Sequence, residues 1–224
     1  MAVNQDVQSI EETLNKTDFG HVVNENKVAI LISAAVVVLG IIVYSVFAYM
    51  QKSERLDILD QAYALETSVF EPFLKDELAP LEYKKKLGDI SNDLRGNINL
   101  VPSFLAGLNK LDQAGKLDSA MKDMTADWFA KMNQGSMGRL FLGLRLSAIY
   151  EDSGEVEKAI TLLENFANDS NLSLMQDKVH FDLVRLSVQM KDTKKAKQYF
   201  EKLKSDHQGS QFFKYAKVYM SGLL

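Results

Sequence analysis

The sequence contains no cysteine and only three prolines among its 224 residues. The missing cysteine excludes disulfides, thiolate nucleophiles and thiolate metal sites. Neither sign of charge is in large excess, because 26 basic and 30 acidic side chains give a formal net charge of −4. A chain this close to neutral lacks the basic surface that nucleic-acid binding needs. The composition therefore excludes a thiol enzyme and argues against a nucleic-acid-binding protein.

Catalytic and metal-binding motifs are absent as well. The three histidines, His21, His180 and His207, are far apart in the sequence, and none belongs to a His-Glu-x-x-His motif. The segment Gly135–Gly138 lacks the preceding strand and the Lys-Ser/Thr ending of a phosphate-binding loop, so we interpret it as a loop and helix cap. No catalytic residue, cofactor site or metal site is predicted, and the protein is not expected to be an enzyme.

The longest apolar run, Val28–Met50, has 23 residues and no charged side chain. A helix of this length spans roughly 34 Å, slightly more than the hydrocarbon core of a bilayer. Thirteen of its residues are Leu, Ile, Val or Phe, which supply roughly −4 to −8 kcal/mol of insertion free energy. The run is longer than the core of a signal peptide. It predicts an uncleaved transmembrane anchor, with residues 1–27 as a short polar tail.

The orientation of this anchor does not follow from charge alone. Lys16 and Lys27 precede the run, and Lys52 and Arg55 follow it, so the positive-inside rule favours neither side. A small-xxx-small pair at the start of the run is too weak a signal to predict dimerisation. The membrane orientation and the oligomeric state therefore stay open at this point.

The rest of the chain has helical periodicity and no alternating run bounded by hairpin turns, so no sheet is expected. A first helix is predicted from about Ser53, ending or kinking near Pro72, because proline lacks an amide hydrogen. Pro80 opens a second helix that ends at Gly96, and Pro102 opens a third. The side chains expected to face inward from the second helix are Leu81, Leu87, Ile90 and Leu94.

Three later segments are versions of one element: a turn, a capped first helical turn, and a small residue where two helices approach closely. Their alanines are 39 and 37 residues apart, which is the spacing of stacked helical hairpins. Each hairpin has an apolar face that it cannot bury alone, so stacking forms the core. A generic helical bundle with coincidental glycines is the alternative. The segments are Gly115–Ala120, Gly154–Ala159 and Lys191–Ala196.

The middle segment resembles the tetratricopeptide (TPR) pattern of Leu-small-x-x-Tyr, turn Gly, Ala and a bulky apolar residue. The residues that match are Leu146, Ser147, Tyr150, Gly154, Ala159 and Leu163. The predicted fold is all-α, with the transmembrane helix followed by a TPR-like α-solenoid over residues 101–224. A helix over 210–224 is expected to cap its open end. Residues 51–100 form a helical region that joins the anchor to the repeats, and whether they add a degenerate repeat stays open.

A partner-binding groove is predicted from the repeat register. In a TPR solenoid the first helix of each pair lines a concave surface that binds an extended or helical segment of a partner. Projection of the register places a mixture of aromatic and charged residues there, which suits peptide recognition, although each of them could instead pack between repeats. The predicted groove residues are Leu105, Asn109, Asp112, Phe141, Leu144, Glu151, Asp152, Lys178, Phe181, Arg185 and Gln189.

Together these features are similar to a bacterial family, the single-spanning, TPR-containing ancillary subunits of the SecYEG translocon. Members of that family have a short cytoplasmic tail, one anchor near the amino terminus and a periplasmic TPR domain. Residues 51–100 match it only in being helical. The residues that carry the resemblance are Val28–Met50, Leu144–Tyr150, Gly154–Ala159, Leu162, Leu163, Leu183–Phe200 and Gly209–Ala216.

The resemblance implies a non-enzymatic adaptor in the bacterial inner membrane, with its amino terminus in the cytoplasm and its carboxyl-terminal domain in the periplasm. The implied partners are the SecYEG translocon and periplasmic chaperones, and the implied role is to assist Sec-dependent translocation and periplasmic folding. A TPR scaffold for another envelope complex, in outer-membrane assembly or cell division, is the alternative. An anchored enzyme would need a deep pocket with convergent ionisable groups.

Overall fold

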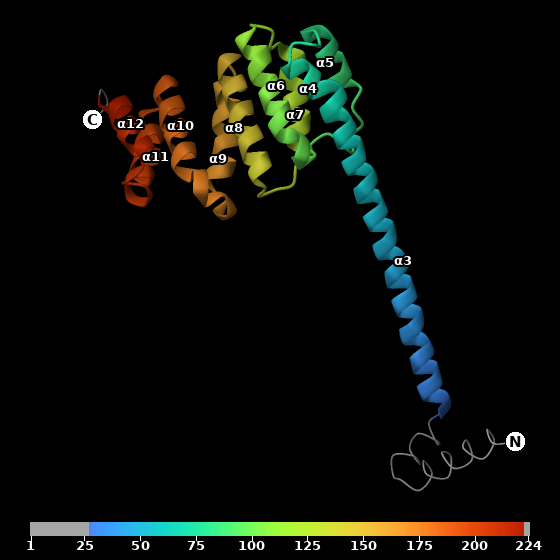
Figure 1. Ribbon diagram of the computed structural model, residues 1–224. Helices are drawn as coiled ribbons and strands as arrows, with labels where there is room; N and C mark the ends of the chain where they lie inside the picture. Colours follow the sequence, from blue (N-terminus) through green and yellow to red (C-terminus); the bar gives the residue numbers. More distant parts are fainter. Residues whose placement is uncertain (1–26, 222–224) are drawn as a thin grey trace, which may run out of the picture. The chain divides into compact units, whose positions relative to one another are not determined.

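The structure is a computed structural model that describes the backbone of residues 27–221. Helices form every regular element in this range, with no strand, which confirms the all-α prediction for these residues (Figure 1). The predicted polar tail of residues 1–27 lies outside the described range except for Lys27. Side chains are described throughout the range except at residues 27–36, 38, 51–55, 170 and 171.

The chain divides into two compact units, Met1–Asp57 and Ile58–Leu224. Helix α3, Lys27–Leu65, is a single α-helix of 39 residues, so the prediction that a new helix begins near Ser53 is wrong. No proline interrupts this stretch, and its second half is rich in good helix formers, so nothing ends the helix earlier. Among the described residues, no helix combines the length and apolar character needed to cross a membrane. The anchor over residues 28–50 therefore stays a prediction.

The irregularity expected at Pro72 is a widened turn followed by a short helix. A π-helical turn, Glu66–Phe70, leads into α4, Glu71–Leu74, with Pro72 in the first turn of α4. Proline has no amide hydrogen, and its ring crowds the carbonyl four residues earlier, which a wider turn relieves. The helical path therefore continues past Pro72 and ends at Leu74.

The second predicted helix is shorter than expected. Helix α5, Pro80–Gly88, ends eight residues before Gly96, and the buried Ile90 and Leu94 lie in the irregular segment that follows. The inward orientation predicted for Leu81 is wrong, because its side chain is 82% exposed. Tyr83, on the opposite side of the first turn of α5, is the buried residue. A 3₁₀ turn, Ile98–Leu100, precedes the next helix.

The remaining helices form antiparallel pairs that stack in sequence order (Figure 1). Short polar side chains cap several of them, because Asp118, Ser136, Asp192 and Ser210 each accept a hydrogen bond from a backbone N–H in the following first turn. The pairs are α6 (Val101–Gln113) with α7 (Ser119–Lys131), α8 (Met137–Asp152) with α9 (Val156–Ala167), and α10 (Gln176–Gln189) with α11 (Thr193–Asp206). A 3₁₀ segment, Ser170–Met175, precedes α10, and α12 (Gln211–Met220) lies within the predicted cap of 210–224.

The turns inside the three pairs share one geometry. Gly115, Gly154 and Lys191 all have positive φ angles, of 64°, 78° and 59°. In each turn the N–H of that residue bonds to the carbonyl three residues earlier, and the next N–H bonds to the carbonyl five residues earlier. This is the left-handed helix ending that glycine favours. The turn positions that the sequence aligned are therefore equivalent in the structure.

A small residue was predicted after each turn, where two helices approach closely. This prediction is confirmed in the second and third pairs and is wrong in the first. Ala159 and Ala196 are fully buried, whereas Ala120 is exposed and its neighbour Met121 is buried instead. The physical reason is the length of the turn. Helix α7 begins four residues after Gly115, whereas α9 begins two residues after Gly154, so the equal spacing in the sequence points to different faces of the two helices.

Three apolar clusters run along the second unit. The first joins the end of α3 to α4, α5, α6 and α7, and contains Phe73, Phe104 and Trp128. The second joins α8, α9 and α10, and the third joins α10, α11 and α12. Residues of the predicted joining region, such as Phe73, thus share a core with the first hairpin.

Candidate functional site

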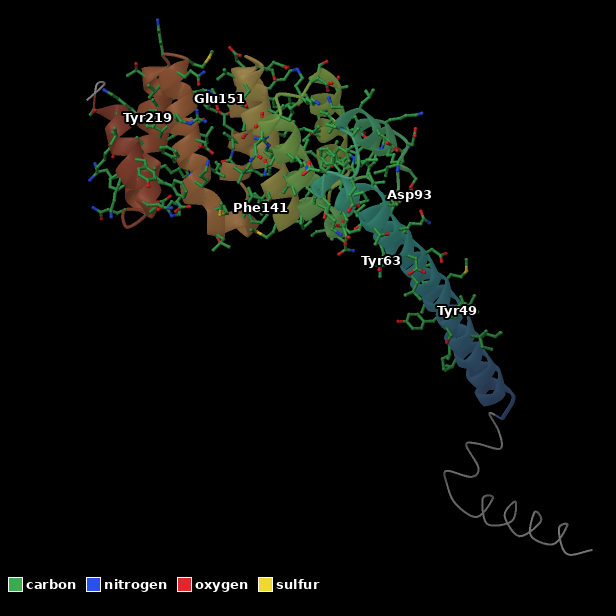
Figure 2. All side chains as sticks on the ribbon, turned by 45° about the horizontal axis from the view of Figure 1, so that its top comes forward. Tyr49, Tyr63, Asp93, Phe141, Glu151 and Tyr219 are labelled. Atoms are coloured by element: carbon green, nitrogen blue, oxygen red, sulfur yellow. The ribbon has the colours of Figure 1, made fainter. Side chains whose placement is uncertain are left out.

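The eleven predicted groove residues all lie on first helices of the pairs, namely α6, α8 and α10. None of them is buried. Phe141, on α8, leaves 44% of its surface exposed, and Figure 2 shows it together with Glu151 on the same helix. The described surface therefore has the exposure that a binding role requires.

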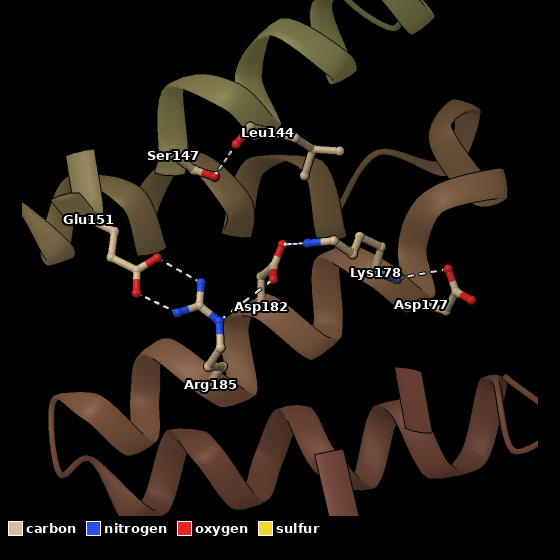
Figure 3. A network of polar contacts seen from close by, with 7 residues as sticks. All are labelled: Leu144, Ser147, Glu151, Asp177, Lys178, Asp182 and Arg185. Atoms are coloured by element: carbon tan, nitrogen blue, oxygen red, sulfur yellow. Dashed lines mark hydrogen bonds and ion pairs between the residues drawn. The ribbon is translucent and has the colours of Figure 1, made fainter. Parts of the chain in front are cut away.

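Ion pairs connect successive first helices across this surface. Arg145 of α8 donates to the Asp112 carboxylate of α6, with 2.8 Å between Nη2 and Oδ2. Arg185 of α10 binds Glu151 of α8 through both terminal nitrogens, and the Nη2–Oε2 distance is 2.7 Å (Figure 3). A planar guanidinium matches a carboxylate in this two-point geometry. These pairs fix the spacing of α6, α8 and α10.

Asp182 is the centre of the network on α10. It is buried, and it accepts from Lys178 one turn earlier, while its Oδ1 lies 3.9 Å from Nε of Arg185 (Figure 3). A buried carboxylate without such partners would be strongly destabilising. Glu151, Arg185, Asp182 and Lys178 thus form one continuous chain of alternating charge, which we call the α8–α10 network.

The electrostatics of the α8–α10 network keep its arginine charged. The hydrogen bond to Glu151 raises the pKa of the Arg185 guanidinium above its ordinary value, against the opposing effect of burial. Both side chains of this pair are largely shielded from solvent, so salt screens them less than a surface pair. We expect the network to orient side chains on this surface.

An aromatic cluster adjoins the network where α10 meets α12. The ring of Phe181 lies 5.7 Å from Phe212, 6.1 Å from Tyr215 and 5.8 Å from Tyr219, measured between centroids. Lys178 Nζ lies 5.9 Å from the Phe212 ring. Tyr215 and Tyr219 are 52% and 45% exposed. We call these four rings the α10–α12 aromatic cluster.

The structure separates ten of the eleven predicted residues into three groups, and Phe141 is the exposed ring described above. Glu151, Lys178 and Arg185 meet in the α8–α10 network, Phe181 is the hub of the aromatic cluster, and Asp112 joins Arg145. By contrast, Leu105 packs against the first core cluster and Leu144 against the second, so inter-helix packing explains both. Asn109, Asp152 and Gln189 are exposed, and Asp152 lines a cavity of about 210 Å³ with Asp112 and Lys122.

Several residues of this surface were not predicted from the sequence. Asp182 and Arg145 carry no motif, and their partners lie 3 to 33 positions away on other turns or helices. The rings of α12 did carry a signal: Phe212, Tyr215 and Tyr219 repeat at helical spacing beside the buried stripe Phe213, Ala216 and Met220. Two apolar stripes on one short helix indicate that one of them is free for a partner.

Comparison with known proteins adds no identity. No family model, no curated protein and no solved structure matches the chain. In the part of the chain that the structure describes, no group of three or more histidine or acidic side chains could hold a metal ion. The function must therefore be inferred from the surface itself.

Proposed function

We propose that the protein is a membrane-anchored helical-repeat adaptor, of TPR type, that binds a segment of a partner protein on the face formed by α8, α10 and α12. The observation that carries this proposal is the α10–α12 aromatic cluster beside the α8–α10 network. Exposed tyrosines supply large contact area at low entropic cost and are enriched at binding hot spots. The adjacent charges would orient the bound segment.

The anchor part of the proposal rests on the apolar run of residues 28–50. Its described large side chains between Val37 and Met50 each leave more than half of their surface exposed. In water such a continuous apolar surface on all sides of a helix is unfavourable, whereas a bilayer covers it. The tether would hold the binding face at a membrane.

The partner class follows from the resemblance given above. We propose a role beside the SecYEG translocon, with the repeat domain in the periplasm and the amino terminus in the cytoplasm. The second candidate function is that of a scaffold for another envelope complex. In that case we expect neighbouring proteins at the septum or the outer membrane. Proximity labelling from a carboxyl-terminal tag in the native cell separates the two, because it reports the side of the membrane and the neighbours together.

The binding face is tested by charge substitution on α12. The double change Tyr215→Glu and Tyr219→Glu should reduce co-purification of the partner at least tenfold, because it removes two hot-spot rings and adds repulsive charge. The matched control is Val218→Glu on the same helix, where the side chain is 72% exposed. Retention of the partner by the double variant, with the helical content unchanged, would contradict the proposal.

A further inference from the structure

A second groove lies between the second helices α7 and α9, with α8 as its floor. Two adjoining cavities, of about 480 and 390 Å³, share Phe129, Leu162 and Asn165 in their walls. Because these side chains border both cavities, the two cavities are neighbours, and we call the pair the α7–α9 groove. It extends along α8 from Arg139 to Tyr150.

The α7–α9 groove is on the other side of α8 from the proposed partner-binding face. Arg139, Leu146 and Tyr150 are separated by seven and four residues, so they lie along one stripe of the helix. Phe141 and Asp152 are two and thirteen residues from Arg139, which turns them roughly 140–160° away around the helix axis. The two surfaces can therefore be altered separately.

Two aromatic rings in the walls of the groove pack against α8 where that helix has a glycine. Phe129 and Phe166 pack edge to face, with centroids 6.0 Å apart. A Cβ at Gly143 would lie 2.3 Å from Cζ of Phe166 and 2.9 Å from Phe129, so no larger residue fits beneath them. One half of the groove is correspondingly apolar, with Ala126, Leu146 and Leu162 among its walls.

Arg139 lines the other half of the α7–α9 groove. Its Nη1 donates to the carbonyls of Phe129 at 2.7 Å and Met132 at 3.0 Å, which satisfies the carboxyl end of α7. Its guanidinium lies 3.9 Å from the centroid of the Phe129 ring. Arg139 forms no ion pair with any residue that the structure describes, and burial lowers its pKa. A partly desolvated cation without a counterion favours the binding of an anion.

The other polar walls of this half are mostly side-chain amides. Gln134, Asn165 and Asn168 line it, and Asp169 contributes a carboxylate. The Nδ2 of Asn168 already donates to the Glu164 carbonyl at 2.9 Å, so this residue offers its Oδ1 as an acceptor. The amides of Gln134 and Asn165 can both donate and accept, which matches the N–H and C=O groups of a peptide backbone. An alkyl chain would leave these groups unpaired.

We propose that the α7–α9 groove binds the apolar carboxyl-terminal segment of a protein, with its terminal carboxylate on Arg139. The stretch from Arg139 to Tyr150 is 11 residues of helix, or roughly 16 Å, which accommodates about five extended residues. The amides pair with the backbone near the terminus, and the apolar half receives the preceding side chains. This site is independent of the α10–α12 aromatic cluster and of the function proposed for it.

The test uses the complete 224-residue chain in detergent micelles and a library of fluorescent hexapeptides whose last three residues are Leu, Val, Ile or Phe. The library is prepared both as free acids and as carboxyl-terminal amides, and binding is measured by anisotropy. The best free acid is expected to bind at least tenfold more tightly than its amide. Arg139→Gln should abolish this difference, and Asp169→Asn should strengthen binding of the acid by removing a like charge.

A second variant keeps the test valid if Arg139→Gln impairs folding. Asn165 is exposed at the junction of the two cavities, so Asn165→Trp should block the groove and abolish binding while the helical content is unchanged. Tyr219→Glu, on the other face, should leave binding unaltered. Equal affinity for acid and amide, absence of any binding peptide, or binding of dodecanoate in place of the peptides would overturn the proposal.

Discussion

Arg185 shows how much of the proposed binding face depends on single side chains. Its two-point contact with Glu151 joins α8 to α10, and its Nε approaches the buried Asp182. Removal of the Glu151 charge leaves a shielded guanidinium without its main partner. The α8–α10 network therefore connects two helices and also forms the charged half of the proposed binding face.

Glu151→Gln should lower the free energy of unfolding by about 1–2 kcal/mol, because it breaks a charge-assisted pair that solvent reaches poorly. The matched control is Asp112→Asn, whose carboxylate is half exposed in its pair with Arg145 and which should cost less than about 1 kcal/mol. Urea denaturation followed by circular dichroism measures both. Equal costs would show that burial does not distinguish the two pairs.

His180 is expected to make the stability of the protein depend on pH. Its ring is buried, and this burial lowers the pKa of the imidazole below its ordinary value. The positive charge of Lys202 and the neighbouring His207 lower the pKa further, by less. Asp206 and the hydrogen bond with the Gln176 carbonyl raise it. The unfolded chain thus takes up the proton at higher pH than the folded chain. Stability is fully present above the unfolded pKa and falls as the pH drops through the folded pKa.

The urea midpoint should accordingly be lower at pH 5.5 than at pH 7.5, and His180→Gln should show a smaller difference between the two values. An undiminished difference in the His180→Gln variant would assign the pH dependence to other groups.

At the level of single helices and turns, the sequence predicts the turns between paired helices correctly. It predicts less well which residues of the following helix are buried. Gly115 and Gly154 predict a left-handed turn, and Lys191 has the same positive φ although it is not a glycine. The exposed Ala120 was predicted to be buried because the longer first turn cannot be seen in an equal spacing of residues. Turn chemistry is local, whereas the buried face depends on where the next helix begins.

Lys191→Gly should stabilise the protein by about 0.5–1 kcal/mol, because a side chain at positive φ is strained and glycine is not. Gly154→Ala should destabilise it by about 1–2 kcal/mol for the converse reason. Thermal unfolding of both variants measures the pair. Effects of the same sign would contradict the common geometry of the two turns.

On the scale of the whole molecule, periodicity and repeat spacing were sufficient to predict helices that stack in pairs. They could not reveal that α3 runs without a break to Leu65, because nothing in residues 51–65 distinguishes a new helix from a continued one. The candidate site was predicted in outline through Glu151, Lys178, Phe181 and Arg185. Its remaining members needed the three-dimensional register of α8, α10 and α12, which sequence spacing does not supply.

The face formed by α8, α10 and α12 is proposed to bind a protein partner. The most direct measurement is site-specific photo-crosslinking in the native cell, with the photoreactive residue at Tyr219 or Phe141 and, as the control, at the exposed Lys197 of α11. We expect one discrete adduct, the same from both face positions and absent from Lys197. Adducts from Lys197 alone, or none from either face position, would contradict it.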